Sequence, residues 1–261
     1  MIMPKKAKTN AIKETISAAS MMISKDMPFA VKEAYKAIRT NILHILKDKE
    51  DKKWFSVTSP CPGTGKTTVA VNLGISFAEL GRKTVVIDAD MRKPMIARMF
   101  QIRNKSGLSE FLNGDTENTG VTETSYKNLY VITSGEIPDN PSELLSSERF
   151  GLLLDELSKE FDYIIVDTPP VGMVTDAAVI SAAVSGTLLV IKQNYTDKER
   201  FDATVNALRK VDANILGYVL NAVDEDRYSY RYGRYSSYYG GYYGGYYGRE
   251  KEEAEKHKIT N

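Results

Sequence analysis

The 261-residue sequence predicts an α/β fold, a doubly wound and mostly parallel sheet with helices on both faces. Short apolar runs rich in Val, Ile and Thr alternate with amphipathic runs along most of the chain. Two of the apolar runs are followed at once by aspartate, as in buried strands whose carboxyl ends face a ligand. A glycine-rich turn separates one expected strand from the next expected helix. This alternation indicates crossover connections and therefore parallel strands.

Composition limits the class of protein. A hydrophobic content of 42% is enough for a substantial core, and a net charge of +1 gives no global attraction to nucleic acid or anionic membrane. The single cysteine excludes an internal disulfide framework. No apolar run approaches the 18 residues of a spanning helix, and the basic N-terminus lacks the apolar stretch of a signal peptide. We therefore expect a cytoplasmic protein.

The chain divides into three parts. Residues 1–27 are polar and Lys-rich, and we expect a flexible arm with at most a short helix near residues 12–22. Residues 28–226 carry the globular pattern, which opens with a helix over residues 28–47 whose apolar positions recur at helical spacing. On the polar face of this helix lie Glu33, Lys36 and Arg39, at spacing that by itself is typical of a solvated surface.

A strand over residues 54–58 leads into the sequence Ser-Pro-Cys-Pro-Gly-Thr-Gly-Lys-Thr-Thr, and a helix closed by Gly81 follows. Strand, glycine turn, Gly-Lys-Thr and helix form the context of a phosphate-binding loop, so we expect a P-loop NTPase fold that binds ATP. Pro60 stands where this motif has its first glycine, and an ordinary glycine turn is the alternative. The residues expected to hold the phosphates are Pro62, Gly63, Thr64, Gly65, Lys66, Thr67 and Thr68.

Two further strands end in carboxylates. The strand that begins at Thr84 leads to Asp88 and Asp90, and the strand over residues 162–166 leads to Asp167. Open α/β sheets bind ligands at the carboxyl ends of their strands, so these groups should lie near the loop. With the Thr67 hydroxyl, Asp90 and Asp167 are the ligands we expect for Mg²⁺.

The rest of the globular pattern continues the alternation. We expect a short helix over residues 107–112, a polar loop over 113–128 and a strand over 129–133. A helix over residues 140–160 should begin at Pro141 or Ser142. The later helices are expected at residues 176–184 and 197–211, and the later strands at 187–192 and 215–221.

The tail, residues 227–261, differs from the rest. From Arg227 to Arg249 every residue is Tyr, Arg, Gly or Ser, so the segment has no aliphatic side chain for a core and should be disordered. A low-complexity spacer and a stacking segment for RNA or self-association are both open from composition alone. Its tyrosines are Tyr228, Tyr230, Tyr232, Tyr235, Tyr238, Tyr239, Tyr242, Tyr243, Tyr246 and Tyr247.

The loop, Val-Val-Ile-Asp-Ala-Asp-Met-Arg-Lys-Pro, Ile-Ile-Val-Asp-Thr-Pro-Pro and the tyrosine tail together resemble the bacterial tyrosine kinases (BY-kinases). The resemblance covers the chain from about residue 28 and implies an ATP- and Mg²⁺-dependent tyrosine kinase of capsule and exopolysaccharide synthesis. It is closest to the separate cytoplasmic form, which a transmembrane activator of the polysaccharide chain-length type recruits to the membrane. The family assembles rings through Glu-x-x-Arg-x-x-Arg, which Glu33, Lys36 and Arg39 match except that lysine, without the bidentate fork, replaces the middle arginine.

The resemblance also implies site roles. Lys66, Asp88, Asp90 and Asp167 form the catalytic set, with Asp88 as the base that accepts the tyrosine proton, although Asp88 and Asp90 could exchange roles. Asn221 resembles the adenine-reading asparagine of related ATPases. The tail tyrosines become the phosphate acceptors, delivered to the chain's own site or to a neighbour's, and other protein substrates are expected, with no nucleic acid.

Two other classes of protein remain open. A partitioning or positioning ATPase switch shares the fold, but usually carries a lysine just after the loop's first glycine, where this chain has Cys61. A non-catalytic adaptor conflicts with the complete set of loop and aspartate residues. Cys61 is either a redox brake or a tolerated small residue, and His44 and His257 are too few and too distant for a metal site.

Overall fold

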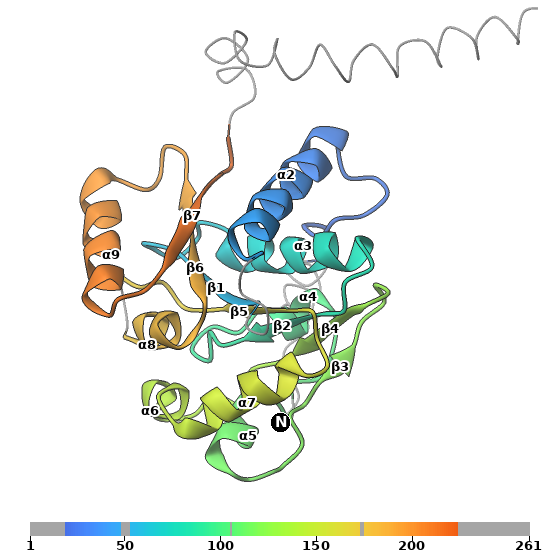
Figure 1. Cartoon of the computed structure of the whole chain (residues 1–261), viewed down its shortest axis with the longest axis vertical. Helices are drawn as coiled ribbons and strands as arrows, with labels where there is room; N and C mark the ends of the chain where they lie inside the picture. The colour runs from blue at the N-terminus through green and yellow to red at the C-terminus, as the bar shows by residue number, and fades with distance from the viewer. Residues whose placement is uncertain (1–18, 48–52, 105, 173–174, 224–261) are drawn as a thin grey trace, which may run out of the picture. The chain divides into compact units, whose positions relative to one another are not determined.

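The computed structural model describes residues 19–47, 53–104, 106–172 and 175–223. Their strands form one seven-stranded sheet in the order β3-β4-β2-β5-β1-β6-β7 (Figure 1). Every neighbouring pair is parallel except β3 and β4, which are antiparallel. The prediction of a mostly parallel, doubly wound α/β sheet is confirmed. Among these residues no helix has both the length and the apolarity to cross a bilayer.

Most elements lie where the apolar pattern predicts them. The strands are β1 (Trp54–Thr58), β2 (Thr84–Asp88), β3 (Thr122–Glu123), β4 (Leu129–Ile132), β5 (Tyr163–Asp167), β6 (Gly186–Lys192) and β7 (Ile215–Asn221). The helices are α2 (Phe29–Ile45), α3 (Lys66–Glu79), α4 (Ile96–Met99), α5 (Leu108–Asn113), α6 (Pro141–Leu145), α7 (Glu148–Ser158), α8 (Asp176–Ala183) and α9 (Lys198–Lys210).

The strand order brings the acidic strand ends together. β2 and β5 are parallel neighbours, and Asp88 pairs with Asp167 at their carboxyl ends. β5 also pairs with β1, where Val57 lies opposite Asp167, and β1 leads directly into the glycine-rich loop. Since the carboxyl ends of parallel strands meet at one edge of a sheet, the loop and both carboxylates share that edge.

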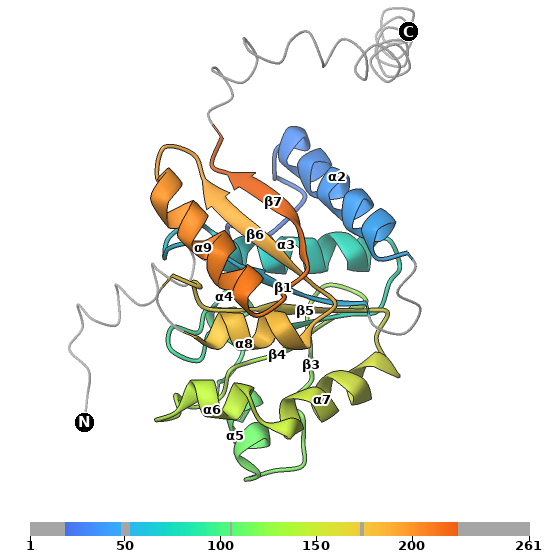
Figure 2. The ribbon, with the colours of Figure 1, turned by 60° about the vertical axis from the view of Figure 1, so that its left-hand side comes forward.

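Alternating side chains of the strands fill two cores on the two faces of the sheet. Val86 and Ile165 belong to the core under α2 and α3, while Val85 and Ile164 belong to the core over α7. Figure 1 shows α2 and α3 on the opposite side of the sheet from α7. In Figure 2, α9 lies along β6 and β7 at one end of the sheet. This arrangement leaves the carboxyl edge of the sheet open for the site.

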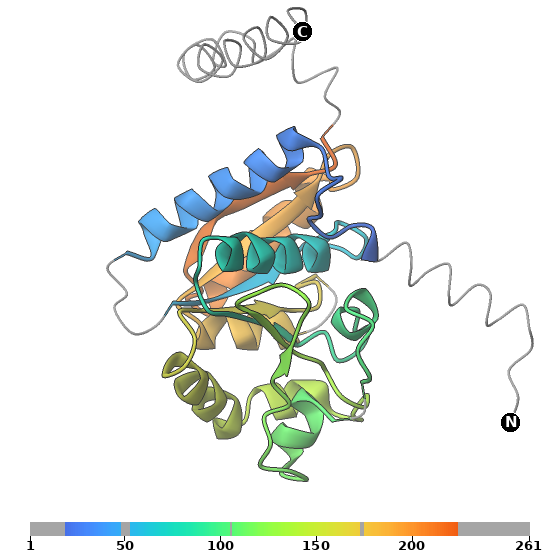
Figure 3. The same cartoon turned by 90° about the vertical axis from the view of Figure 1, so that its right-hand side faces the viewer.

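Helix α3 is the central helix of the first core. From Val69 to Ala78 every residue is buried, because the helix lies between the sheet and α2 (Figure 3). On α2 and just beyond it, Ile42 and Leu46 are 2% and 1% exposed, and full burial of each such side chain stabilises the fold by about 1.5–3 kcal/mol. The loop that precedes α3 is therefore attached to a rigid element.

The region expected to be one helix over residues 140–160 is two helices, so that prediction is wrong in detail. Ser146 and Ser147 separate α6 from α7, and their hydroxyls donate to the carbonyls of Ser142 and Leu144. Serine side chains compete with helical backbone bonding in this way. Ser147 is extended and begins α7 as its N-cap residue.

Two short elements were not predicted. Strand β3 lies inside residues 113–128, which we expected to be a loop, and α4 follows Pro94. Both are too short to show a periodic pattern. Helix α4 is held by a distant acceptor, because the Asp88 carboxylate accepts the backbone N–H groups of Met95 and Ile96.

The packed domain begins before residue 28, within the segment expected to be an arm. Met22 and Ile23 are buried in the first core. The side chain of Asn72 on α3 accepts the Ile23 N–H at 2.7 Å and donates to the Met21 carbonyl at 2.9 Å. Residues 1–18, which include most of the expected short helix, lie outside the described residues, as do the tail and its ten tyrosines.

Candidate active site

The loop between β1 and α3 is built around two glycines. Gly63 and Gly65 have φ of +75° and +89°, in the left-handed region that favours glycine. A Cβ on Gly65 would also lie 2.2 Å from the Nδ2 atom of Asn221, so space as well as conformation requires glycine there. Pro60 has no left-handed φ, and the loop forms without a glycine at that position. The loop leads straight into the N-terminus of α3, where unpaired N–H groups favour an anion.

Lys66, the first residue of α3, lies among buried carboxylates. Its Nζ atom is 2.8 Å from Oδ2 of Asp90 and 3.8 Å from Oδ1 of Asp167. The Asp90 and Asp167 side chains are 7% and 0% exposed. The structure thus brings together the lysine and the two acidic strand ends that the sequence predicts for the site.

Asp88 and Asp90 face different groups although they are two residues apart. Oδ2 of Asp88 accepts the two N–H groups at the start of α4, and its Oδ1 is buried without a hydrogen-bond partner among the described residues. Asp90 accepts from Lys66 and from the backbone N–H of Lys93. Asp90 therefore faces the loop, while Asp88 holds the segment that follows β2.

The site carries more negative than positive charge. Burial raises the pKa of Asp88 to about 8, and the nearby Asp167 carboxylate adds to this rise. Burial raises the pKa of Asp167 to about 6, against the opposing effect of Lys66. Burial lowers the pKa of Lys66, but the Asp167 and Asp90 carboxylates outweigh it and the net shift is upward. At neutral pH Asp88 therefore keeps its proton, and one ammonium group beside the Asp90 and Asp167 carboxylates leaves an excess of negative charge.

The donors present fit a magnesium ion that arrives with a nucleotide. Both carboxylate oxygens of Asp167 are buried, and the Lys66 and Thr67 side chains, which hold its pKa down, lie near them without a hydrogen bond of ordinary geometry. The Thr67 hydroxyl lies 3.3 Å from Nζ of Lys66, beside these carboxylates. Within the described ranges no group of three or more His, Cys, Asp or Glu side chains forms a metal cage. Mg²⁺ needs none, because it retains waters and binds one or two protein oxygens plus phosphate.

A cavity of about 410 Å³ opens beside the loop, a volume typical of small-molecule sites. Its lining includes the polar side chains of Lys66, Thr67 and Asp90. It also includes three methionines, Met21, Met95 and Met99. Pro169 and Pro170, which follow Asp167, also line the cavity.

Three side chains, from the end of β6, the turn that follows it and the end of β7, contact or lie beside the loop. Asn221 donates from Nδ2 to the Thr64 carbonyl at 2.8 Å, so in this structure it contacts the loop backbone. The Tyr195 hydroxyl donates to the Pro62 carbonyl at 3.0 Å, and Nζ of Lys192 lies 5.0 Å from the centre of the Tyr195 ring. No sequence motif indicated that Lys192 or Tyr195 would lie at the loop. Only the position of β6 next to β1 brings them to the loop.

Arg92, which belongs to the second motif, has a partner that the sequence did not predict. Its Nε donates to Asp176 Oδ2 at 2.9 Å, and the Asp176 side chain is fully buried at the start of α8. Ser142 of α6 also donates to Asp176. This cluster joins α6 and α8 to the segment after β2 and so fixes one rim of the cavity.

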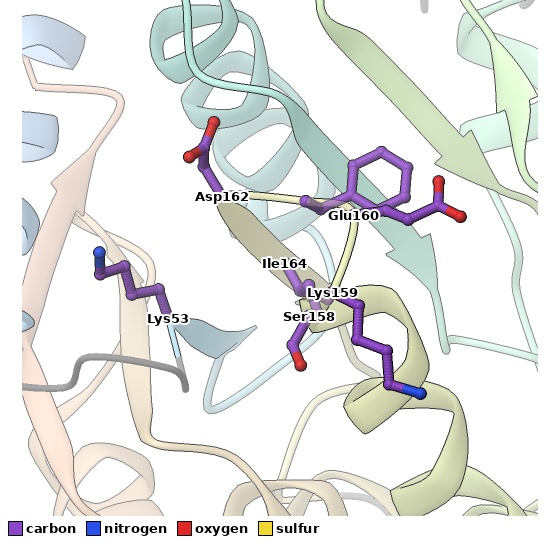
Figure 4. A pocket seen from close by; sticks show the side chains of 7 residues that line it. Lys53, Ser158, Lys159, Glu160, Asp162 and Ile164 are labelled. Atoms are coloured by element: carbon purple, nitrogen blue, oxygen red, sulfur yellow. The ribbon is translucent and has the colours of Figure 1, made fainter.

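A second cavity, of about 230 Å³, lies at the amino end of β5 (Figure 4). It is lined by Lys53, by Ser158 to Asp162 and by Ile164. The loop and the carboxylates are at the carboxyl ends of the strands, so this cavity is at the opposite edge of the sheet. It is not part of the candidate active site.

The three residues expected to form oligomer contacts differ in their surroundings. Glu33 and Lys36 form an exposed ion pair of 2.7 Å on α2. Arg39 instead donates from Nη1 to the carbonyl and hydroxyl of Ser76 on α3. Glu33 and Lys36 thus face solvent, whereas Arg39 contacts its own domain.

Known proteins share this architecture. The family profile described as an AAA domain matches residues 52–215. Tyrosine-protein kinase CpsD of Streptococcus pneumoniae serotype 4 is 41% identical over 194 residues, which cover 74% of this chain and 84% of that protein. The kinase domain of the Escherichia coli tyrosine kinase ETK superposes with a TM-score of 0.71 at 33% identity, and the match covers 77% of this chain and 82% of that structure.

The rival class of ATPase is a more distant relative. The cell division ATPase MinD of Pyrococcus furiosus matches with a TM-score of 0.56 at 25% identity, over 65% of this chain and 71% of that structure. Both proteins have the P-loop fold, but the kinases match over a larger share of the chain and at higher identity. The chain therefore belongs to the bacterial tyrosine kinase family and is a protein-tyrosine kinase with an ATP-binding P-loop.

Proposed function

We propose that this kinase phosphorylates the tyrosines of its own C-terminal segment, residues 228–247, mainly in a second copy of the chain. The observation that carries the proposal is the position of Lys66 among Asp90, Asp167 and Asp88 at the mouth of the loop. These are the groups that phosphoryl transfer from ATP requires. The acceptors are supplied by the same chain, which has ten tyrosines between Arg227 and Arg249.

Each group has a distinct role in this mechanism. The N–H groups of the loop and Nζ of Lys66 bind the phosphates, for which Lys66 leaves its contact with Asp90. Thr67, Asp90 and Asp167 would hold Mg²⁺, which neutralises charge on the transferring phosphoryl group. The tyrosine oxygen forms a bond to the γ-phosphorus as the bond to ADP breaks, and the phenolic proton passes to a carboxylate. Asp88, with one free buried oxygen, is our candidate base, and Asp90 is the alternative.

Delivery to a neighbour requires an oligomer, which we propose to be a ring. The exposed Glu33 and Lys36 pair supports this, because it is free to form contacts with a second copy. Each phosphate adds about −1.5 to −2 charges, so a fully modified tail repels its neighbours and loosens the ring. An unchanged oligomer mass after complete phosphorylation would contradict this step.

We also propose a partner and a process. The partner would be a transmembrane activator that recruits this chain to the inner face of the membrane, as the resemblance to the separate cytoplasmic form of the family implies. The process would be capsular or exopolysaccharide synthesis, with further protein substrates phosphorylated on tyrosine. Phosphorylation that is unaffected by the activator's cytoplasmic segment would contradict the partner.

The test is the intact mass of the protein after incubation with ATP and Mg²⁺. Several added phosphates should appear on the wild type, and none on Lys66→Met or on a chain that ends at Asp226. Mixing the Lys66→Met chain with the active, shortened chain separates the two routes, because only transfer between copies adds mass to Lys66→Met. ATP hydrolysis without any mass gain, even with the activator present, would favour the MinD-like switch instead.

A further inference from the structure

Three methionines line the same cavity as the catalytic groups. Met21 precedes α2, Met95 precedes α4 and Met99 is the last residue of α4, and all three line the cavity that Lys66 and Asp90 also line. Methionine makes favourable contacts with the edges and faces of aromatic rings, and it adapts its shape to them. We call these residues the methionine wall.

The methionine wall is fixed to the catalytic machinery. The Met21 carbonyl accepts from Asn72, and its sulfur lies 3.9 Å from the Thr68 hydroxyl at the end of the loop. The Met95 N–H donates to Asp88, the candidate base. Met99 is 3% exposed and packs into the first core, whereas Met21 is 49% exposed at the cavity mouth. The position of the wall relative to the carboxylates is therefore set by the fold.

The cavity is lined by both charged and apolar side chains, and a phenol likewise combines a polar oxygen with an apolar ring. A tyrosine that attacks the γ-phosphate must place its oxygen beside a carboxylate and the phosphate, and its ring against apolar surface. We propose that the methionine wall binds the ring of the acceptor tyrosine, with Met21 and Met95 as specificity-determining residues. The proposal rests on the kinase activity and does not depend on which tyrosine is modified.

A nucleobase is the other aromatic group that this site must accept. The base is attached at the far end of the triphosphate from the reacting phosphorus, whereas the wall is joined to Asp88 through Met95. The other side of the loop carries Tyr195, Lys192 and Asn221, and none of these three lines the cavity. We therefore assign the wall to the acceptor and the β6–β7 side to the nucleotide.

Kinetics with a separate acceptor provide the first test. The acceptor is a synthetic peptide with the sequence of residues 227–240, given to the full chain with ATP. In Met21→Ser and Met95→Ser the KM for the peptide should rise about three- to tenfold, with the KM for ATP within twofold of wild type. Met21→Leu, which keeps an apolar side chain at this position, should have a KM for the peptide close to that of the wild type. Leu152→Ser, at a 64% exposed position on α7, is the matched control for loss of a surface apolar group.

A cross-linking experiment tests the same contact without turnover. The peptide carries p-benzoylphenylalanine in place of its tyrosines, and irradiation joins the benzophenone carbon to a nearby carbon whose hydrogen moves to the ketone oxygen. With the Lys66→Met chain, cross-links should map to Met21 or Met95.

The outcomes separate the possibilities. Cross-links elsewhere, or an equal rise of both KM values, would overturn the proposal, and the latter would assign the wall to the nucleotide. If no tyrosine is phosphorylated, the kinase function fails, and the cross-links still decide whether the wall binds the ring.

Discussion

Replacing Asp88 by asparagine should stabilise the ligand-free protein, and the gain should grow as the pH rises. The carboxyl group has a pKa of 3.8 in its ordinary state and about 8 in the folded protein, chiefly because it is fully buried. Between these pH values the folded state keeps a proton that the unfolded chain has released. Stability therefore falls as the pH rises from about 4 to about 8. Asparagine cannot ionise and does not share this loss.

The size of the effect follows from the pKa difference. A shift from 3.8 to about 8 corresponds to about 6 kcal/mol, at about 1.4 kcal/mol for each unit. The carbonyl oxygen of asparagine can still accept hydrogen bonds from the Met95 and Ile96 N–H groups. Its NH₂ group, however, replaces Oδ1 of Asp88, which has no hydrogen-bond partner among the described residues. An unpaired buried amide costs about 1–3 kcal/mol. The net gain at pH 8 should be about 3–5 kcal/mol, with a net loss near pH 4.

Urea unfolding in the presence of EDTA and without nucleotide measures this effect. The difference between Asp88→Asn and wild type should change by about 4 kcal/mol between pH 5 and pH 8. Asp155→Asn, on the exposed face of α7, controls for the general loss of a negative charge. The nearby Asp167 carboxylate adds to the raised pKa of Asp88, so the change should spread over this range. A difference that is the same at both pH values would refute the reasoning.

Three further substitutions test the loop and its supports. Gly65→Ala should lower ATP affinity more than tenfold in a binding assay, because a φ of +89° disfavours alanine and its Cβ would meet Asn221. Adding Asn221→Ala removes that contact but not the unfavourable φ, so the double variant should recover only part of the lost ATP affinity. Tyr195→Phe should raise the KM for ATP about two- to tenfold through loss of the Pro62 hydrogen bond, and an unchanged KM would remove Tyr195 from the site. Asn72→Ala should reduce the free energy of unfolding by about 1–3 kcal/mol, and it should speed the exchange of the amide hydrogens near residue 23. Exchange as slow as in the wild type would contradict this prediction.

The sequence was sufficient for the parts of the site that are local or that follow from one rule. The loop is a continuous motif, so its glycines and Lys66 could be identified directly. Asp90 and Asp167 are far apart in sequence, but parallel strands place their carboxyl ends at one edge. The lysine-to-carboxylate distances of 2.8 Å and 3.8 Å agree with that expectation.

Other features depend on the order of strands and on contacts between distant segments. Lys192 and Tyr195 reach the loop because β6 pairs with β1, and no local pattern indicates that pairing. The attachment of residues 21 and 23 to α3 uses hydrogen bonds to the side chain of Asn72, about 50 residues away in the sequence. The break between α6 and α7 depends on serine hydroxyls that bind nearby carbonyls. Periodicity carries no information about such contacts.

The identity of the base illustrates the same limit. The sequence left open whether Asp88 or Asp90 is the base. In the structure β2 stops at Asp88 and Asp90 lies beyond it, where alternation no longer sets the direction of the side chain. Asp88 fixes α4, and Asp90 holds Lys66, so replacing either one should reduce activity for reasons other than lost basicity. The pH profile separates these effects, because a base must be ionised to accept the proton. If Asp88 is the base, its raised pKa in the free enzyme predicts that kcat/KM increases with pH up to about 8. The Asp90→Asn variant should be slow but keep this increase, whereas Asp88→Asn should lose it. The opposite pattern would assign the base to Asp90.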